Sequence, residues 1–552
     1  MTTAIALLCL FAVGSPPSVA DDGGQKAETR LVLSSSDHWV APGQELSLSV
    51  ALEPRPDRMA VVVVEMLPET LFDRVDPEDP FRLRAVREGV CRVRVRGGGL
   101  TSNAITLVVR DSERPTERVS SLRQYGVTWT FEEPVRAGRF VSGDWWVVGP
   151  VTVVSKSPAA SGEGHHGSMV NPPVGRNSGY DPRVPFYDPN LSATFPLKLE
   201  PGDSLVSTVS HLGDKARWDL LGRKVSVDHC HLESAAVLTV VEAPLPPTSF
   251  RPPYVGTARP YFDRSALRTD RLPNLEPQVG PYCVGRDVGK RVCQQYAEYF
   301  ERPWILHVTD WVGRQTHPSD NMPNYHREVY NLIADTSLLL LCDLRDREDL
   351  LTGFVQLGID SHFVSQAGAG DSSLHKWTIL FAGLMLDSPE LLGNRASFRT
   401  DWMTYRVEDA ASPVASRIVS EGQGWTGAKV LWRQDPGEAE HEHLHPEEWE
   451  AVPLEGGGRR REVYRRSNSV TWPGVALAAR LMNAQRWWRH EPFFEYADRW
   501  MAEDDSENFV LIQERWDVRL PVHGGTCSSP FVENMWKRYR KRDADADGGE
   551  EQ

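Results

Sequence analysis

The sequence lacks the features that mark several common classes of protein. Beyond the N-terminus no stretch is apolar enough for a membrane helix, which needs about 20 residues; the apolar run 338–341, for example, lies between Asp335 and Asp343. Cysteines never occur as CxxC pairs, so a structural zinc site is not expected. HExxH, GxSxG, P-loop sequences and a GxGxxG between a strand and a helix are also absent. We therefore expect no membrane span, no metal and no cofactor.

Positive charge is scarce as well. The chain of 552 residues has 61 Lys and Arg against 76 Asp and Glu, which gives a formal net charge of -15. Nucleic-acid binding depends on a basic surface, so a nucleic-acid partner is not expected. A local basic cleft on an acidic protein still admits another kind of polyanionic ligand.

Residues 1–20 have the pattern of a cleavable signal peptide. The apolar run from Ile5 to Val13 is too short to cross a bilayer. Ser18-Val19-Ala20 supplies the small-x-small pattern that a signal peptidase accepts. We expect a secreted or periplasmic protein that is cleaved near Ala20. The alternative is a buried apolar strand at the N-terminus.

Six of the seven cysteines lie after this segment, and an even number in an exported chain permits disulfides. Cys283 and Cys293 are the closest pair and are expected to form a disulfide. Cys91 and Cys342 lie in apolar patterns, which favours buried free thiols.

Residues 29–111 alternate apolar and polar side chains with a period of two, as β-strands do. Short strands with regular turns over such a length predict a β-sandwich. The segment Val40-Ala41-Pro42-Gly43-Gln44 resembles bacterial immunoglobulin-like modules. We expect this domain to be a spacer or adhesion module.

Residues 122–250 are also rich in strand patterns and contain a long Gly/Pro-rich segment at 156–194. A loop of this length in a compact domain is typically functional or disordered. Residues 145–148 and 151–154 are expected to form a hairpin that turns at Gly149-Pro150.

The remaining residues change to the spacing of helices. Helices are predicted at 288–300, 327–344, 349–364, 375–387, 472–484 and 491–501. The fold class is therefore expected to be a multidomain β + α protein, with an array of antiparallel helix pairs, an (α/α) toroid, at 251–540. The acidic tail 541–552 is expected to be disordered.

The densest group of polar and aromatic residues lies at 304–327, directly before a helix. Asn side chains hydrogen-bond carboxylates, Tyr and His move protons, and Trp stacks on sugar faces. The candidates in this group are Trp311, Asn321, Asn324, Tyr325, His326 and Arg327. The alternative is a loop that is packed by its own tryptophans and caps the helix.

Two further groups also lie beside predicted helices. The second group is His375, Lys376 and Trp377, for which the alternative is a structural histidine. The third group is Tyr464, Arg465 and Trp472. A tyrosine beside arginines at a helix start suits anion binding, and the alternative is a solvated basic loop.

Alternate loops of an antiparallel helical array emerge at the same end, so the three groups are expected to share one rim. The expected catalytic residues are Tyr325, His326, His375 and Tyr464. The expected substrate-binding residues are Trp311, Asn321, Asn324, Arg327, Lys376, Trp377, Arg465 and Trp472.

Two histidine-rich segments are weaker candidates. The tract 440–445 alternates Glu and His without fixed helical spacing, which favours a solvated loop over a metal site. His165-His166 lies in the Gly-rich segment of the second β region, and the same interpretation applies.

The helical part resembles a group of exported bacterial proteins with toroid folds that are associated with carbohydrates. The resemblance covers about half of the chain and rests on 320–328, 354–360, 376–383, 476–482 and 493–500. Toroid-fold polysaccharide lyases are similar in a general way, without a motif that matches residue by residue. The segment 369–374 is shorter than the Gly/His-rich loop usual in the group, which also fits an inactive or altered member.

The resemblance implies an exported carbohydrate-active protein with a polysaccharide or glycan as its partner. The first expectation is a polysaccharide lyase that acts on a uronic-acid glycan by β-elimination, and a glycoside hydrolase is the other enzyme class considered. The alternative is a non-catalytic surface protein that binds glycan or acts in adhesion.

Overall fold

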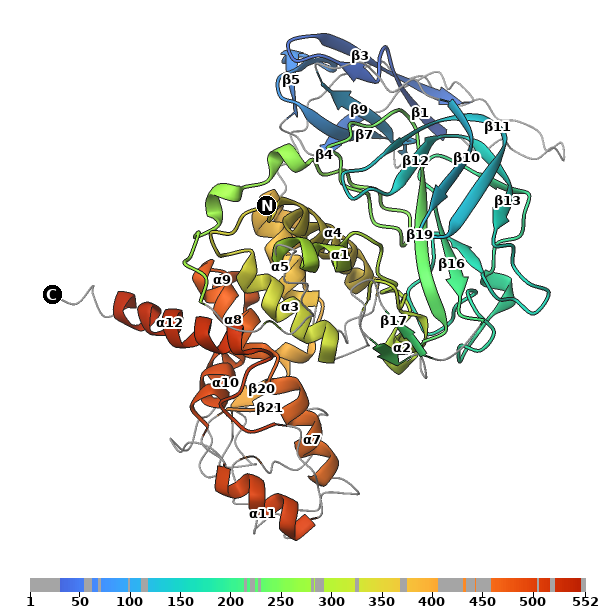
Figure 1. Ribbon diagram of the computed structural model, residues 1–552. Helices are drawn as coiled ribbons and strands as arrows, with labels where there is room; N and C mark the ends of the chain where they lie inside the picture. The colour runs from blue at the N-terminus through green and yellow to red at the C-terminus, as the bar shows by residue number, and fades with distance from the viewer. Residues whose placement is uncertain are drawn as a thin grey trace, which may run out of the picture. The chain divides into compact units, whose positions relative to one another are not determined.

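A computed structural model of the chain shows a mixed β and α protein with β-rich sheets in its N-terminal part and helices in its C-terminal part (Figure 1). The structure describes residues 30–53, 62–67, 71–97, 100–110, 118–212, 216–218, 224–226, 230–278, 282, 292–322, 327–367, 375–405, 430–432, 442, 458–503, 506–516 and 522–547. The predicted signal peptide therefore lies outside the described residues and stays a prediction.

The chain folds into two compact units. The first comprises Met1–Ala159, Ala193–Val206 and Val237–Leu267. The second comprises Ala160–Ser192, Ser207–Ala236 and Arg268–Gln552. The Gly/Pro-rich segment that the sequence analysis placed in a β domain at 122–250 thus belongs, from residue 160 to 192, to the same unit as the helices.

Two sheets form the N-terminal part of the first unit. One has the order β1 (Arg30–Ser35), β3 (Glu45–Glu53), β6 (Asp79–Ala85) and β5 (Phe72–Asp76). The other has the order β2 (Trp39–Val40), β9 (Ile105–Val109), β7 (Gly89–Gly97) and β4 (Val62–Leu67), with β8 (Leu100–Thr101) also beside β7. Alternate side chains of both sheets, such as Leu33, Leu83, Val93 and Leu107, form one apolar cluster. The period-two alternation therefore predicted these strands correctly.

A third sheet has the strand order β14-β16-β19-β12-β11-β13-β15, and β10 pairs with β11. Its strands are β10 (Arg118–Gln124), β11 (Val127–Arg139), β12 (Trp145–Val148), β13 (Val151–Ser157), β14 (Ser168–Val170), β15 (Leu197–Leu199), β16 (Ser204–Ser210) and β19 (Leu232–Val241). Residues of β16 and β19 belong to both units.

The predicted hairpin at Gly149-Pro150 is wrong. β12 and β13 both pair antiparallel with β11 in one continuing register, Ala137↔Val147 and Phe131↔Val153. The chain therefore runs on in the same direction through Gly149-Pro150, and these residues interrupt one strand line instead of reversing it.

The second unit contains the helices. They are α1 (Val292–Phe300), α2 (Gly313–Thr316), α3 (Arg327–Leu339), α4 (Glu348–Gln366), α5 (His375–Leu386), α6 (Pro389–Leu392), α7 (Gly458–Ser469), α8 (Trp472–Leu481), α9 (Gln485–Trp488), α10 (Glu491–Ala502), α11 (Ser506–Trp516) and α12 (Pro530–Asp547). Two short pairs of strands accompany them, β17 (Ala216–Trp218) with β18 (Lys224–Ser226) and β20 (Met403–Tyr405) with β21 (Val430–Trp432).

All six predicted helices are present with small shifts of their ends. Six further helices of the described residues were not predicted: the four-residue helices α2, α6 and α9, and the longer α7, α11 and α12. The last of these continues to Asp547, so the first part of the tail predicted as disordered is helical.

Helix packing in the second unit depends on close approach at small residues. α4 packs against α1 and α5, and α3 packs against α8 and α12. A Cβ atom at Gly358 of α4 would lie 2.2 Å from the carbonyl oxygen of Thr378 in α5. A Cβ at Gly474 of α8 would lie 2.8 Å from the Cβ of Ala334 in α3. Neither glycine has room for a side chain, so both fix how closely their helices pack.

Some of the cysteine predictions are confirmed and one is wrong. Cys91 and Cys342 are buried free thiols, as predicted. Cys293 is also a free, buried thiol in α1, where burial raises its pKa to about 11. The structure therefore does not contain the predicted Cys283–Cys293 disulfide, and Cys283 lies outside the described residues. Within the described ranges, no helix has the length and hydropathy needed to cross a membrane.

Candidate functional site

The structure places the predicted catalytic residues only in part. Tyr325 and His326 lie outside the described residues, as does Asn324. His375 begins α5 and Arg327 begins α3, but their side chains are not described. Tyr464 is half-buried within α7 rather than at a helix start. The predicted shared rim is therefore not assembled by the described residues.

Lys376 and Trp377, the other members of the second group, are packed inside the second unit. The Lys376 ammonium forms an ion pair with Asp401. Burial lowers the pKa of Lys376, and the charge of Asp401 opposes this shift. Trp377 is 1% exposed and stacks on Trp488 with ring centroids 6.5 Å apart. A ring in this position has no free face, so its predicted role in stacking on a sugar is wrong for this structure.

Arg465 belongs to a buried ion network, defined here as Glu442, Glu462, Glu503, Arg465, Arg466 and Arg499. The Arg465 Nε lies 2.6 Å from Glu462 Oε1, and its Nη1 lies 3.4 Å from Glu503 Oε2. Arg466 Nε donates to the other oxygen of Glu462 at 3.1 Å. Arg499 donates to Glu442 at 2.6 Å. Three carboxylates thus balance three guanidiniums, so the solvated basic loop considered for this segment is also wrong.

Aromatic rings enclose this network. Trp472 is 3% exposed and packs edge-on against Trp432 and Tyr496. The Tyr496 hydroxyl accepts from Arg465 Nη1 at 3.2 Å and lies 3.0 Å from the Ser469 hydroxyl. Burial raises the pKa of Tyr496, with the carboxylate of Glu442 adding to the shift. Trp472 is therefore a wall of the network and not the sugar platform that the sequence analysis predicted.

The one described residue of the tract 440–445 is Glu442, and it is not solvated. It is buried, binds Arg499, and accepts from the backbone N–H of Trp432 at 2.9 Å. Among the described residues, no group of three or more acidic, histidine or cysteine side chains is arranged to hold a metal ion.

Asn321 is likewise a structural residue. Its side-chain amide is buried and donates to the carbonyl oxygens of Tyr299 at 3.3 Å and Arg302 at 3.1 Å. These bonds tie the end of the 304–322 segment to the C-terminal end of α1 and match the packed-loop alternative for this part of the segment.

Trp311, by contrast, lies at the surface. It is 49% exposed. Phe186, which belongs to the Gly/Pro-rich segment far away in the sequence, is also 49% exposed. Arg176 connects the two: its guanidinium carbon lies 5.9 Å from the centre of the Phe186 ring, and its Nη2 lies 2.7 Å from Asp310 Oδ2. We call these four residues, Arg176, Phe186, Asp310 and Trp311, the aromatic surface.

Backbone geometry explains why these four side chains meet. The Gly175 N–H donates to His307 at 3.0 Å, and the Thr309 N–H donates to Gly175 at 2.9 Å, so the two segments run side by side. Phe186 and Asp310 both have left-handed backbone conformations, with φ of 61° and 62°. Such conformations are uncommon for residues other than glycine, and they occur often at ligand sites.

A second polar group lies in the same segment, and the sequence analysis had interpreted its histidine as part of a solvated loop. His165 Nδ1 lies 3.2 Å from Asp181 Oδ2, and Arg183 binds the same carboxylate through both of its oxygens at 2.9 and 2.8 Å. Burial alone would raise the pKa of Asp181, but hydrogen bonds from Arg183 and Ser210 outweigh it and hold this pKa well below its usual range. Asp181 is therefore a permanent anion that orients the His165 ring.

Tyr187 lies close to this histidine. Its hydroxyl occupies the space that a Cβ atom at Gly164 would need, at 2.3 Å. Burial and the nearby charge of Asp181 raise the pKa of Tyr187, so its hydroxyl stays protonated and can donate. The segment thus offers an oriented imidazole and, against the preceding Gly164, a phenol, and both are groups that move protons.

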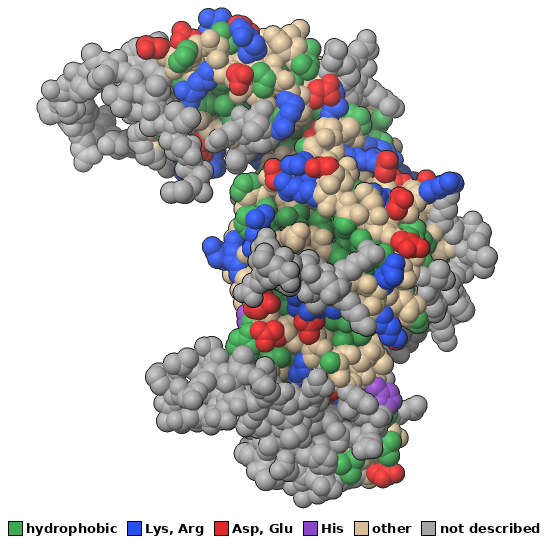
Figure 2. All heavy atoms as spheres, turned by 90° about the vertical axis from the view of Figure 1, so that its left-hand side faces the viewer, with side chains coloured by type: hydrophobic (Ala, Val, Ile, Leu, Met, Phe, Trp, Pro, Cys, Tyr) green, Lys and Arg blue, Asp and Glu red, His purple; other side chains and the backbone are tan. Residues whose placement is uncertain are grey.

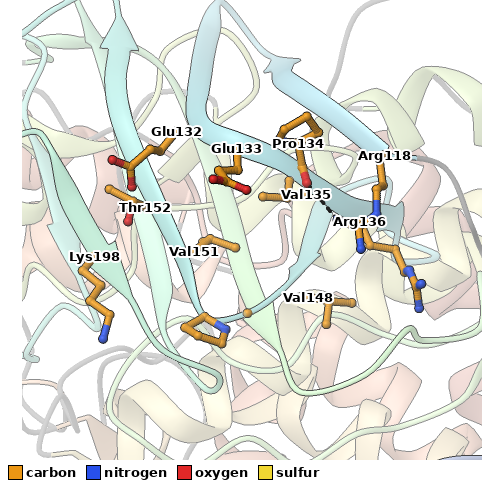
Figure 3. A pocket seen from close by; sticks show the side chains of 12 residues that line it. Arg118, Glu132, Glu133, Pro134, Val135, Arg136, Val148, Val151, Thr152 and Lys198 are labelled. Carbon is orange, nitrogen blue, oxygen red and sulfur yellow. Dashed lines mark hydrogen bonds between the residues drawn. The ribbon is translucent and has the colours of Figure 1, made fainter.

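The first unit contains a pocket of about 590 Å³ in the third sheet. It is lined by Arg118, Glu132, Glu133, Pro134, Val135, Arg136, Val148, Gly149, Pro150, Val151, Thr152 and Lys198 (Figure 3). Both signs of charge line this pocket. On the molecular face drawn in Figure 2, described basic and acidic side chains are likewise interspersed.

Comparisons of the chain with protein-family models, with curated proteins and with solved structures found no match. The resemblance to exported toroid proteins therefore stays a prediction.

Proposed function

We propose that the protein is an exported glycan-binding protein, and that its aromatic surface binds a polysaccharide that carries carboxylates. The observation that carries this proposal is the joint exposure of Trp311 and Phe186 beside Arg176. Exposed aromatic rings stack on the apolar faces of sugars, and a guanidinium pairs with carboxylates through parallel N–H groups.

Arg176 has donors to spare for such a ligand. Its side chain is 54% exposed, and only Nη2 donates to Asp310. Asp310 pairs with the guanidinium and also accepts from the backbone N–H of Trp311 at 2.7 Å, so one carboxylate contacts both the cation and the backbone that carries the ring. Pre-positioned groups lose less conformational entropy on binding.

Affinity electrophoresis of the full mature chain tests the proposal. We expect retardation in gels that contain polygalacturonate, weaker retardation with its methyl ester, and the weakest with dextran. Arg176→Ala should remove the preference for the charged polymer over its ester. Arg345→Ala, which removes an exposed arginine elsewhere in the second unit, should change nothing. Equal migration in all gels would contradict the proposal.

The His165–Asp181 pair favours a second candidate function, β-elimination at the same uronic-acid glycan. In that reaction a base removes the proton beside the sugar carboxylate, the bond to the leaving oxygen breaks, and a carbon–carbon double bond forms. Asp181 would hold the Nδ1–H of His165, so that Nε2, which lies 3.4 Å from the exposed Glu163 carboxylate, accepts the proton. The leaving oxygen would take a proton from Tyr187 or water. Polygalacturonate incubated with the wild-type chain should then yield unsaturated ends that His165→Gln does not produce. If the wild-type chain forms no unsaturated product, β-elimination is contradicted and glycan binding remains as the proposed function.

The finer architecture is part of the proposal. We propose that the two N-terminal sheets are an immunoglobulin-like sandwich, supported by their common apolar cluster. We also propose that the helices form a toroid of antiparallel pairs, supported by the packing of the consecutive helices α4 and α5. An experimental structure in which the helices do not close around a common axis would contradict the toroid.

A further inference from the structure

The pocket in the first unit arises from a break in the third sheet. Val119↔Val135 and Ser121↔Thr130 are successive pairs of β10 with β11, so residues 131–134 of β11 lie opposite Ser120 alone. Such a bulge bends a strand and interrupts its ladder. Pro134, which has no N–H to donate, lies within the bulge.

The opposite edge of β11 is interrupted at the same place. Its pairing with β13 ends at Phe131↔Val153, and its pairing with β12 begins at Ala137↔Val147. Residues 132–136 therefore face 148–152 without pairing, and these two stretches supply most of the pocket lining. The pocket is a gap between strands, and the stretch of β11 that pairs with neither β12 nor β13, which includes Glu132 and Glu133, lies along one wall.

Charged side chains are distributed unevenly around this gap. Arg118 and Arg136 lie next to each other on one side, Glu133 lies centrally, and Glu132 lies on the other side near Thr152 and Lys198 (Figure 3). Lys198 is paired with Glu200 at 2.6 Å. Arg118 donates to the Pro134 carbonyl at 3.1 Å, which holds it at the bulge. The Arg136 Nε is buried and has no hydrogen-bond partner in the described part of the chain. No described residue forms an ion pair with Glu132 or Glu133.

We propose that this pocket binds a small zwitterion of amino-acid to short-peptide size, which carries one carboxylate and one ammonium group. The ligand carboxylate pairs with Arg118 and Arg136, because a guanidinium matches a carboxylate with parallel donors. The ligand ammonium pairs with Glu133 and Glu132. Amide groups between the two ends hydrogen-bond the unpaired backbone of the bulge, as an added strand does.

Size and lining favour this class over a sugar. Small-molecule sites commonly have volumes of about 300–1,000 Å³, and this pocket falls within that range. None of its described lining residues is aromatic, so it offers no stacking face for a sugar ring. Two guanidiniums on one side of the gap, with Glu133 at its centre and Glu132 across it, match a dipolar ligand better than a singly charged one.

Calorimetric titration of the full mature chain with triglycine tests the proposal. We expect saturable binding that weakens about tenfold or more when the amine is acetylated, and equally when the carboxylate is amidated, because each change removes one charge-assisted pair. These probes use the wild-type chain, so the result does not depend on the folding of any variant. Absence of triglycine binding, or binding indifferent to both modifications, would overturn the proposal.

Variants then assign the two ends of the ligand. Glu132→Gln combined with Glu133→Gln should weaken triglycine binding, and acetylation should cause no further loss in this variant. Arg136→Gln should likewise weaken triglycine binding, and amidation of the ligand carboxylate should cause no further loss in this variant. The matched control is Asp73→Asn, which removes an exposed carboxylate of β5 that is not part of the pocket lining and should bind like the wild type. A loss of the acetylation effect in Asp73→Asn, or its persistence in the double variant, would sink the assignment.

Discussion

The buried ion network and the aromatic surface use the same kinds of side chain in opposite surroundings. In the network, Arg465 is enclosed by carboxylates and by Trp500, Trp472 and Tyr496. At the aromatic surface, one arginine lies over the Phe186 ring and pairs with the carboxylate that precedes Trp311, and both rings are about half exposed. Charges in the first region are fully paired within the protein, whereas Arg176 keeps donors that face water. Exposure, not composition, separates the structural cluster from the surface that we propose binds a ligand.

Removing one carboxylate from the network should have the largest effect on stability. Glu462→Gln leaves Arg465 and Arg466 without the anion that both of them contact. An uncompensated buried charge costs about 4–5 kcal/mol of unfolding free energy. Denaturant titration followed by helical circular dichroism measures this loss.

Glu533→Gln provides the matched control. Glu533 forms an ion pair with Lys537 one turn further along α12, in contact with solvent. Surface pairs of this kind contribute below about 1 kcal/mol. If both variants lose the same stability, the network is not the buried structural element described here.

Truncation of a buried tryptophan should come next in size. Trp377→Ala removes a ring that is packed against Trp488 and Phe381, and should cost about 3–4 kcal/mol. Trp311→Ala, on the exposed surface, should change stability by less than about 0.5 kcal/mol. Thermal unfolding of the two variants side by side measures the contrast, and a large loss in Trp311→Ala would assign that ring to the core.

A pH dependence should follow from the buried histidines of the second unit. Burial lowers the pKa of His307 to about 3 and that of His362 to about 4. The unfolded chain takes up these protons near the ordinary value of about 6.5, so stability falls as the pH drops below about 6.5. Each histidine contributes at most about 1.4 kcal/mol per pH unit.

Replacing one histidine measures how much that histidine contributes to the change of unfolding free energy with pH. His307→Gln should unfold with a shallower dependence between about pH 6 and pH 4 than the wild type. Parallel curves for the two proteins would show that His307 does not take up a proton on unfolding in this range.

The fold could be predicted from the sequence where one periodicity dominates. The stripe of apolar residues at 327–344 predicted α3, which spans Arg327–Leu339. The helix α7 was missed because Gly458–Ser469 is rich in arginine and has no apolar stripe. Its helix is stabilised instead by Glu462, which pairs with Arg465 and Arg466 at spacings of three and four residues and is buried with them.

Only half of the aromatic surface, which we propose as the binding site, could be predicted from the sequence. Trp311 was a candidate because its own segment is dense in polar and aromatic residues. Arg176 and Phe186 were not, because Arg176 pairs with a residue 134 positions away and nothing local indicates that partner. The same holds for His165, whose orientation depends on Asp181 in a separate turn of the loop.

The most direct test of the central claim is the affinity of Trp311→Ala for an oligogalacturonate, measured by isothermal titration. We predict a loss of about tenfold or more, since stacking on a sugar depends on this ring, with the melting temperature unchanged. Trp487→Ala, which removes a half-buried tryptophan elsewhere in the second unit, should keep the wild-type affinity. Wild-type affinity in Trp311→Ala would contradict the account and show that the glycan, if bound, lies on another surface.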